Sequence, residues 1–374
     1  MFQIEMLPAD HGDCLLITYG DALDRHRILI DGGTASTFAR LRQRIEALPR
    51  QERRFDLLIV THIDSDHIDG IVELMLSDLD VRFDDIWFNG WQHLAPPRSA
   101  YLGPRQGDIL GNLLSMKYAL PWNRHFKGRT VVVPETGTLP TRTLRGGMTL
   151  TVLSPRWKEL RKLDAAWIKL ATSQGWFPGE MPPTMAAHRS RMRHLSKVLF
   201  GGDKSPANGS SIAVLASYNG KSCLLAGDAH SSTLAAGIRR LVPPGERLEL
   251  DAFKLSHHGS QANINEELLD AVRCSRYLVS TNGAIFQHPD PPLFTELLQR
   301  SPTPVSLYFN YDVPTTRAWA GSTDARLKKE KLKELHYPAP GTDGLLVELA
   351  PSPAATVPAS RASPRRGKAR APRR

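Results

Sequence analysis

The segment from Thr61 to Gly70 constrains this chain more than any other part of its sequence. Within six positions it places two imidazoles and two carboxylates, on His62, Asp64, Asp66 and His67. The apolar run 55–60 before it has the length and character of a buried strand, and residues 71–76 after it can begin a helix. The four side chains are therefore expected on a strand-to-helix loop, where functional residues concentrate.

Four such side chains crowded on one loop would repel and desolvate one another unless a cation held them together. The alternative is a solvated polar loop whose aspartates cap the following helix. Helix capping requires neither His62 nor His67, so the pattern favours a metal site.

Similar strand patterns recur along the whole chain, with helical patterns between them. The first half has apolar or alternating runs at 2–7, 14–19, 27–30, 55–60 and 85–88. The second half has them at 149–154, 211–216, 222–226, 250–255, 276–281 and 344–349. Two similar halves of this kind predict an α/β fold with two sheets sandwiched between helix layers.

One large domain is expected over residues 1–350, interrupted by a mostly helical insertion at 156–207. The insertion lacks strand patterning and carries three tryptophans and a basic stretch, with Arg189, Arg191, Arg193 and Lys197. It is expected beside the domain and over the site, and the alternative is a surface ornament without function. Residues 95–130 form a second irregular stretch that is expected to border a cleft.

Residues 351–374 form a tail rich in Pro, Ala and Arg that is expected to be disordered. It holds seven of the 48 basic residues and no acid, so without it 41 basic residues stand against 38 acidic ones, a net charge of +3. Such a tail can bind nucleic acid through its phosphates. A solubilising extension without a dedicated partner is the equal alternative.

Composition excludes several classes of protein. No apolar stretch has the 18 or more residues of a membrane span, and the first residues lack the basic and apolar regions of a secretion signal. The three cysteines, Cys14, Cys223 and Cys274, are scattered and lack Cys-x-x-Cys spacing. This usage argues against disulfides and a thiolate metal site, and it predicts a cytoplasmic protein without a membrane partner.

Three later features follow predicted strands and can join the first motif. They are Asp228, the pair His257-His258, and His288. Their simpler interpretations are a helix cap for Asp228 and polar turns for the histidines. Because neighbouring parallel strands end at the same sheet edge, all of them can meet the loop at 61–70.

Taken in order, these motifs resemble a metallo-β-lactamase-fold hydrolase, and the chain is similar to the hydrolase domain of the ComEC-type competence proteins. The resemblance covers residues 1 to about 290, outside the insertion. The matching segments are 11–17, 28–33, 61–70, 225–228, 256–260 and 288–289.

The resemblance implies an αββα sandwich with two divalent metal ions, Zn or Mn, at one edge. In the family motif His-x-His-x-Asp-His, Asp64 stands here in place of the second histidine. This harder, charged ligand shifts preference toward Mn²⁺, Mg²⁺ or Fe²⁺. Asn208 stands where a further histidine is usual, which leaves the first metal with few ligands.

The implied metal ligands are divided between two ions that share Asp228. The first ion is assigned His62, Asp64 and Asp228, and the second Asp66, His67, Asp228 and His257. His258 is assigned to the substrate, although the reverse assignment of the pair stays open. Asp13 and Asp31 are expected to orient ligands rather than to bind metal.

The expected function is metal-dependent hydrolysis by a metal-activated hydroxide. Asp66, His258 and His288 are the catalytic candidates. A phosphodiesterase or nuclease is the leading hypothesis, with nucleic acid reached through the basic tail and insertion. One alternative is a small-molecule ester, lactone or thioester hydrolase, which a narrow apolar pocket lined by Trp87, Trp91 and the insertion would favour. The other is a binding module with a degenerate site.

Overall fold

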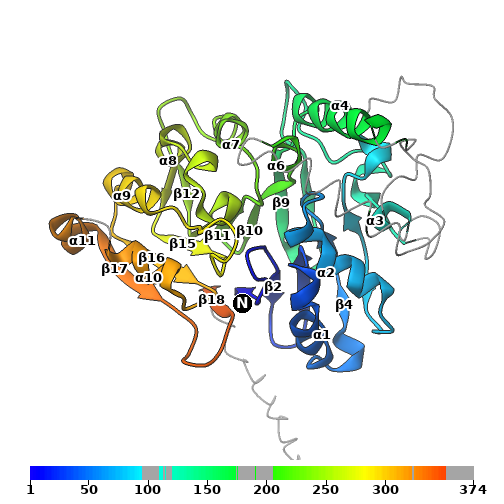
Figure 1. Cartoon of the computed structure of the whole chain (residues 1–374), viewed down its shortest axis with the longest axis horizontal. Helices are drawn as coiled ribbons and strands as arrows, with labels where there is room; N and C mark the ends of the chain where they lie inside the picture. Colours follow the sequence, from blue (N-terminus) through cyan, green and yellow to red (C-terminus); the bar gives the residue numbers. More distant parts are fainter. Residues whose placement is uncertain are drawn as a thin grey trace, which may run out of the picture.

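Two β-sheets packed face to face form the centre of the structure (Figure 1). The computed structural model describes residues 1–94, 109–112, 114, 120–173, 175, 190, 205–321 and 324–350. The first sheet has the order β18-β1-β2-β3-β5-β7. Its strands are β1 (Phe2–Met6), β2 (Leu15–Gly20), β3 (Arg25–Ile30), β5 (Leu57–Ile59), β7 (Ile86–Trp87) and β18 (Leu345–Ala350).

The second sheet takes six of its eight strands from the second half of the chain, with the order β17-β16-β15-β13-β11-β10-β9-β8. Its strands are β8 (Thr141–Thr143), β9 (Thr149–Ser154), β10 (Ala213–Tyr218), β11 (Lys221–Leu225), β13 (Ala252–Lys254), β15 (Arg276–Val279), β16 (Val305–Phe309) and β17 (Leu332–His336). Two short pairs lie outside these sheets: β4 (Arg54–Phe55) with β6 (Arg82–Phe83), and β12 (Leu248–Leu250) with β14 (Val272–Cys274).

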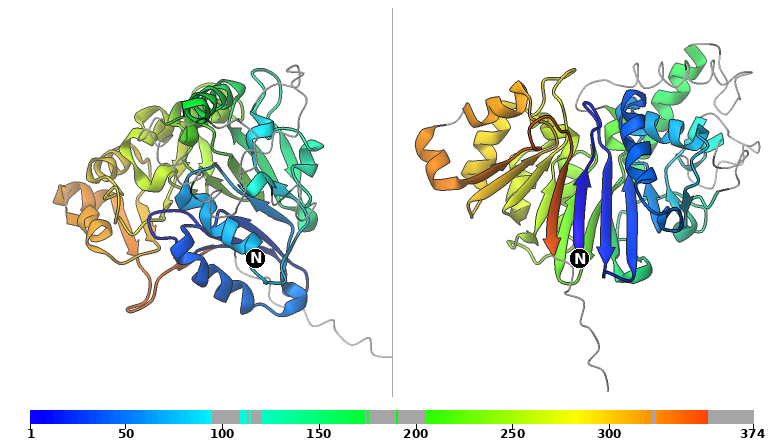
Figure 2. Two further views of the ribbon diagram at one scale, coloured as in Figure 1. Left: turned by 45° about the vertical axis from the view of Figure 1, so that its right-hand side comes forward. Right: turned by 90° about the horizontal axis from the view of Figure 1, so that it is seen from below.

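Helices cover the outer faces of both sheets, and the view from below in Figure 2 shows the four layers. The helices are α1 (Phe38–Glu46), α2 (Ser65–Leu76), α3 (Ile109–Asn112), α4 (Trp157–Ser173), α6 (Pro206–Gly209), α7 (Ser231–Ile238), α8 (Glu266–Ala271), α9 (Pro291–Arg300), α10 (Pro314–Gly321) and α11 (Ala325–Lys331). The expected α/β class and αββα sandwich are confirmed.

Alternating hydrophobicity explains where the core lies. In β1 the side chains of Phe2, Ile4 and Met6 are buried and those between them are half-buried, so one face of the strand turns inward. That face joins a core between the sheets that includes Val152 of β9. A second core joins the outer face of the first sheet to α1, α2 and α4, as Leu58 of β5 illustrates.

Parallel strands position the later functional residues. β3, β5 and β7 run parallel to one another in the first sheet. β11, β13, β15 and β16 do the same in the second sheet. Parallel neighbours end at the same edge of a sheet, so the loops that follow β11, β13 and β15 emerge together.

β18, the last described strand, pairs with the first. It lies antiparallel to β1, with Met6 opposite Leu345 and Phe2 opposite Ala350. In Figure 2 the red strand β18 lies directly beside the blue strand β1, at the marked N-terminus. The edge of β1 that β2 leaves open is therefore covered by a segment more than 330 positions away in the sequence.

The described part of the expected insertion is helical. α4 packs on the first half of the chain, where Trp167 meets Trp91 with 5.3 Å between ring centroids. The basic stretch at 189–197, apart from Ser190, and the tail at 351–374 lie outside the described residues. Within the described ranges, none of the helices combines the length and apolar character needed to cross a bilayer.

Candidate metal centre

The carboxyl ends of β5, β11, β13 and β15 lead to one buried group of imidazoles and carboxylates. Seven of the side chains singled out from the sequence belong to it: His62, Asp64, Asp66, His67, Asp228, His257 and His258. Each is at most 6% exposed. The eighth, His288, is 8% exposed and lies beside the group.

Asp64 is in the helix-capping position of α2, but its side chain does not cap the helix. Its backbone carbonyl accepts from the amides of His67 and Ile68, as a residue at this position does. The carboxylate makes no hydrogen bond to the helix, and both of its oxygens are buried without a hydrogen-bond donor. The interpretation of the Asp64 side chain as a helix cap is therefore wrong. Its two buried oxygens are placed to bind a cation instead.

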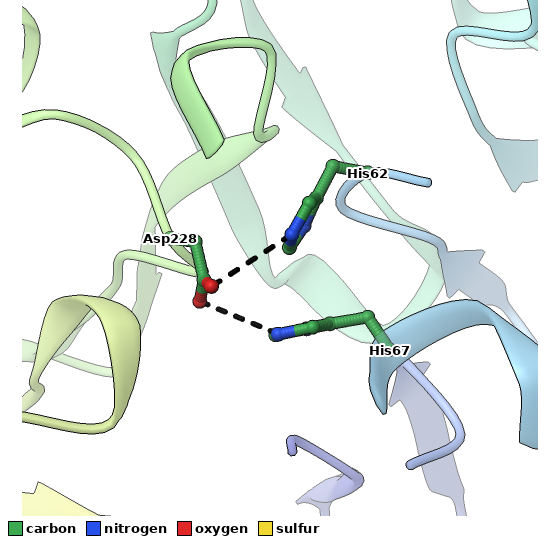
Figure 3. A group of neighbouring side chains, drawn as sticks. All are labelled: His62, His67 and Asp228. Atoms are coloured by element: carbon green, nitrogen blue, oxygen red, sulfur yellow. Dashed lines mark ion pairs between the residues drawn. The ribbon is translucent and has the colours of Figure 1, made fainter. Parts of the chain in front are cut away.

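Asp228 lies between the two histidines of the first motif (Figure 3). His62 Nε2 is 3.7 Å from Asp228 Oδ2, and His67 Nε2 is 3.4 Å from Asp228 Oδ1. The Asp228 amide donates to Ser211 Oγ at 3.0 Å, which holds the loop after β11 in place. One carboxylate thus presents its two oxygens to two different imidazoles, as a ligand shared by two cations would.

Asp66 and His67, on the first turn of α2, form one side of this arrangement together with His258. Asp66 Oδ2 is 3.8 Å from His67 Nε2 and 3.4 Å from His258 Nε2. His258 Nε2 is also 3.8 Å from Asp228 Oδ2. Potential ligand atoms of Asp66, His67 and His258 all lie within 4.8 Å of one another, close enough to share an ion.

His62 and His257 approach the same oxygen of Asp228 on the other side. His257 Nε2 is 3.7 Å from Asp228 Oδ2 and 3.5 Å from the side-chain amide nitrogen of Asn208. His62 Nε2 is 3.5 Å from Asp64 Oδ2. The placement thus differs from the expected division of the pair, since His258, and not His257, is grouped with Asp66 and His67.

A left-handed turn lets both members of the pair reach Asp228. The φ angles of His257 and His258 are +47° and +57°, a region that costs non-glycine residues of order 1 kcal/mol each. The two rings are anchored separately, because His257 Nδ1 is 3.1 Å from Asn263 Oδ1 and His258 Nδ1 is 2.9 Å from the Ser280 carbonyl oxygen. Strain of this kind persists where the surrounding structure enforces it, typically at functional sites.

Asp31 and Asp13 contact the Nδ1 atoms of His67 and His258, on the side of each ring opposite to the ligand cluster. Asp31 accepts from the Thr61 amide and hydroxyl, both at 2.7 Å, and its Oδ2 is 2.8 Å from His67 Nδ1. A carboxylate at Nδ1 keeps the proton there and leaves Nε2 free to bind metal. Asp13 contacts the fully buried ammonium of Lys254, and its Oδ1 is 3.4 Å from His258 Nδ1.

The atoms directed into the group have the chemistry of metal ligands. Six of them are buried and make no hydrogen bond in the described structure: His62 Nε2, both oxygens of Asp64, His67 Nε2, Asp228 Oδ1 and His258 Nε2. Leaving even one buried polar atom unsatisfied costs about 1–3 kcal/mol, so a cluster of them requires compensation. Imidazole nitrogens and carboxylate oxygens satisfied together by divalent cations provide it. The residues therefore fit a divalent metal pair.

Proton binding is strongly perturbed in the same group. Burial opposes ionisation of Asp66 and Asp228, but nearby imidazoles, His67 above all, hold the pKa of both well below the usual range. Burial likewise opposes protonation of His258, yet Asp228 and Asp13 raise its pKa to about 9. Asp228 and Asp66 also raise the pKa of His67 against the effect of burial, so metal binding to His67 and His258 is coupled to the release of protons.

An aromatic rim that the sequence did not single out lies beside the centre. Phe286 is 38% exposed and its ring centroid is 5.8 Å from His288 and 6.2 Å from His11. Burial lowers the pKa of His11, while the carboxylate of Asp66 opposes this shift, so His11 senses the charge of the centre. The only sequence signals were their neighbours, the turn at Gly12 and the candidate His288.

Comparison with known proteins gives a superfamily match for the first part of the chain. Residues 7–77, which include the first motif, match the metallo-beta-lactamase superfamily. No match was found among curated protein sequences. The fold of the described residues, an αββα sandwich, is consistent with this match, which itself covers only residues 7–77.

Similar solved structures extend over most of the chain at low identity. The metallo hydrolase Igni18 from Ignicoccus hospitalis has a TM-score of 0.40 and 12% identity, and covers 92% of this chain and 99% of its own. YhfI from Bacillus subtilis, a metallo-beta-lactamase fold protein, has a TM-score of 0.38 and 11% identity, with 93% and 99% covered. CmlA, a diiron beta-hydroxylase from Streptomyces venezuelae, has a TM-score of 0.38 and 14% identity, with 92% and 54% covered. Similarity this low does not assign a reaction.

Proposed function

We propose that this metallo-beta-lactamase-type domain is a metal-dependent phosphodiesterase that acts on nucleic acid. One observation carries the proposal: a single buried carboxylate, Asp228, has imidazoles at both oxygens, and six buried atoms of this group make no hydrogen bond in the described structure. Two cations held by such a set of ligands would supply the positive charge that a displacement at phosphorus requires.

The distances support a division of ligands in which each member of the histidine pair belongs to a different ion. His62, Asp64, His257 and Asp228 Oδ2 would hold the first ion. Asp66, His67 and His258 would hold the second together with Asp228, whose Oδ1 faces His67 and whose Oδ2 lies 3.8 Å from His258 Nε2. In this division His257 takes the place that Asn208 cannot fill, so the first ion is not short of ligands.

Two bound divalent cations would supply Lewis acidity and an activated water. The chain itself supplies orientation and charge. Asp66 stays ionised because the pKa of its carboxyl is held low, so it can hold a cation and orient a nucleophile. His288 is oriented by Asp290, with 2.9 Å between Nδ1 and Oδ1, and together with His11 it lies where a charged substrate oxygen would need a donor.

Three features support a phosphodiester as substrate. The carboxylate of Asp64 makes the ligand set harder, which suits the cations used in phosphoryl transfer. The motifs resemble those of the ComEC-type hydrolase domain. The exposed ring of Phe286 at the rim offers a face on which a nucleobase can stack.

The burial of Trp87 and Trp91 argues against the alternative of a small-molecule hydrolase. That alternative called for a narrow apolar pocket lined by Trp87, Trp91 and the insertion at 156–207, of which residues 176–189 and 191–204 lie outside the described ranges. Both side chains are instead buried in the two cores, 0% and 4% exposed. Their burial supports a structural role.

The test is a screen of metals against substrates with the full chain. Protein loaded with Mn²⁺, Mg²⁺ or Zn²⁺ is assayed on single- and double-stranded DNA, on RNA, on bis(p-nitrophenyl) phosphate and on p-nitrophenyl acetate, with Asp66→Asn as the inactive control. Cleavage of phosphodiesters that disappears in the control supports the proposal. Cleavage of the carboxylic ester alone would favour the small-molecule hydrolase, and no bound metal with no rescue by Mn²⁺ would favour a degenerate binding module.

A further inference from the structure

A separate cavity of about 700 Å³ lies beside the first sheet, away from the ligand cluster. It is lined by residues 125–130 together with His93, Arg142 and Trp157. Its volume is in the range of small-molecule sites in proteins. None of the proposed metal ligands lines it.

The charge of this cavity is one-sided. Lys127, Arg129 and Arg142 line it, and no carboxylate does among the described residues. The guanidinium of Arg142 donates to the carbonyl oxygens of His125 and Thr141, which leaves its charge uncompensated. Lys127 and Arg129 form no ion pair with any described residue.

Arginines on other surfaces of the molecule are commonly paired. Examples are Arg44 with Glu5, Arg54 with Asp84, and Arg300 with Asp270. Two carboxylates near the cavity have other partners. Glu159, two positions from Trp157, pairs with Arg156, and the buried Asp85 accepts from the Arg124 and His125 amides and the Trp87 indole and lies 2.5 Å from His125 Nδ1. The cavity therefore keeps a concentrated positive charge that the chain does not neutralise.

The wall of the cavity is rigid and partly aromatic. Its turn is fixed to the end of β7, since Asn123 Oδ1 accepts from the Phe88 amide and Asn123 Nδ2 donates to the Phe88 carbonyl. Lys127 follows with φ +57°, a left-handed conformation that is unfavourable for lysine. Arg142 lies over the ring of Phe126, with its Cζ 4.6 Å from the centroid. The guanidinium of Arg142 is thus held in place, and the turn fixes the backbone that carries Lys127 and Arg129.

We propose that this cavity is a binding site for a nucleic acid strand, in which Lys127, Arg129 and Arg142 contact phosphates and Trp157 offers a face to a base. This proposal rests on the proposed function, because the site would hold a strand while the metal centre cleaves it. η3 (Trp91–His93), which contributes His93 to the cavity, follows β7, and β7 is the neighbour of β5, the strand that leads to the metal loop.

A membrane surface is the poorer partner for these cations. Interfacial anchoring combines basic residues with exposed apolar side chains. The exposed large apolar residues of the described chain, such as Leu23, Ile168 and Leu346, do not line the cavity. A concave, charged and aromatic surface instead matches the way single strands are bound.

The experiment measures binding in the absence of cleavage. The full chain carrying Asp66→Asn is titrated into a fluorescein-labelled 20-nucleotide DNA strand, and separately into a labelled mononucleotide, over a range of salt concentrations. The test variant adds Lys127→Ala and Arg129→Ala. The matched control adds Lys329→Ala and Lys333→Ala, two exposed lysines distant in sequence that remove the same charge. The basic tail is present in every protein, so its contribution is the same.

The test variant should bind the strand at least about 10-fold more weakly than the control. The slope of log affinity against log salt should become shallower by about 1.4, because each neutralised phosphate of a single strand contributes roughly 0.7 to it. Equal binding by the test and control variants would overturn the proposal. Loss of mononucleotide binding with unchanged strand binding would overturn the assignment to a strand.

This measurement stands apart from the test of the proposed function. Binding is read in a variant that does not cleave, so it succeeds or fails whatever the metal centre does. Cleavage of bis(p-nitrophenyl) phosphate by the chain with Asp66 intact reports on the metal centre alone. A chain that binds strands through Lys127 and Arg129 but cleaves no phosphodiester would support the binding site and refute the phosphodiesterase.

Discussion

At the scale of single residues, His257 and His258 test the division of ligands directly. Variants are compared by bound metal per chain, measured by elemental analysis after dialysis. If His257 shares an ion with Asp64, the double variant Asp64→Ala with His257→Ala should keep about one metal. Asp64→Ala with His258→Ala, which damages both sites, should lose nearly all metal.

The opposite result would restore the division expected from the sequence, with His257 beside Asp66 and His67. Asp78→Ala, at an exposed carboxylate just beyond α2, is the control that should keep the parent's metal content. Metal content is used because loss of activity alone would not tell one site from the other.

Asp64 is expected to set the preference between metals. Asp64→His replaces a hard oxygen ligand with imidazole, so we expect the protein to shift toward Zn²⁺ when offered equal concentrations of Zn²⁺ and Mn²⁺. Elemental analysis of the competed protein gives the Zn to Mn ratio. A ratio unchanged from the parent would show that Asp64 does not contact the ion.

His93 makes the stability of the fold sensitive to acid. Burial lowers its pKa to about 4, against the opposing effect of hydrogen bonds to Gly128 and Gly90. The unfolded chain takes up a proton on this histidine below about 6.5, whereas the folded chain does not until about 4. Its contribution is therefore complete above pH 6.5 and is lost as the pH falls toward 4, by on the order of 3 kcal/mol.

Urea unfolding of His93→Gln and of the parent between pH 7 and 4 checks this effect. The variant should lose less unfolding free energy over that interval than the parent does. His336→Gln, at a half-buried histidine near the sheet edge, should keep the parent's slope. Parallel curves for His93→Gln and the parent would contradict the assignment.

At the scale of elements, the loop after β15 governs the rim of the metal centre. If Phe286 stacks on a base, Phe286→Ala should raise KM for nucleic acid about 5-fold or more while kcat changes little, because stacking contributes about 1–3 kcal/mol per base. Phe286→Trp should restore KM. A fall in kcat with unchanged KM would show instead that Phe286 supports the position of His288.

Much of the site followed from the order of strands and motifs. Asp228 and the histidine pair could be expected near the first motif because each follows a strand, and parallel strands end at one edge. The side of Asp228 that each imidazole faces could not be predicted. It depends on left-handed φ angles at His257 and His258, which the residue types do not indicate. A role for Lys127 and Arg129 could not be predicted from the sequence either, because the charge of a cavity depends on which carboxylates the fold brings near it.

At the scale of the whole molecule, β18 is expected to be essential for stability. Val347 is 2% exposed between the sheets, whereas its neighbour Leu346 is 55% exposed. Val347→Asp would bury an unpaired charge and should lower the unfolding free energy by more than about 2 kcal/mol. Leu346→Asp, on the same strand, should change it by no more than about 0.5 kcal/mol. Chemical denaturation gives the unfolding free energy of both variants. Equal losses for Val347→Asp and Leu346→Asp would contradict the observed register of β18.

The pairing of β18 with β1 also bears on how the protein is made. More than 330 residues are synthesised between β1 and its partner strand β18. Until β18 is added, β1 has a neighbour on one side alone, and its other row of amides and carbonyls is open to any strand it meets. The nascent chain is therefore exposed to mispairing of β1 while the residues between the two strands are made, and the addition of β18 ends this exposure.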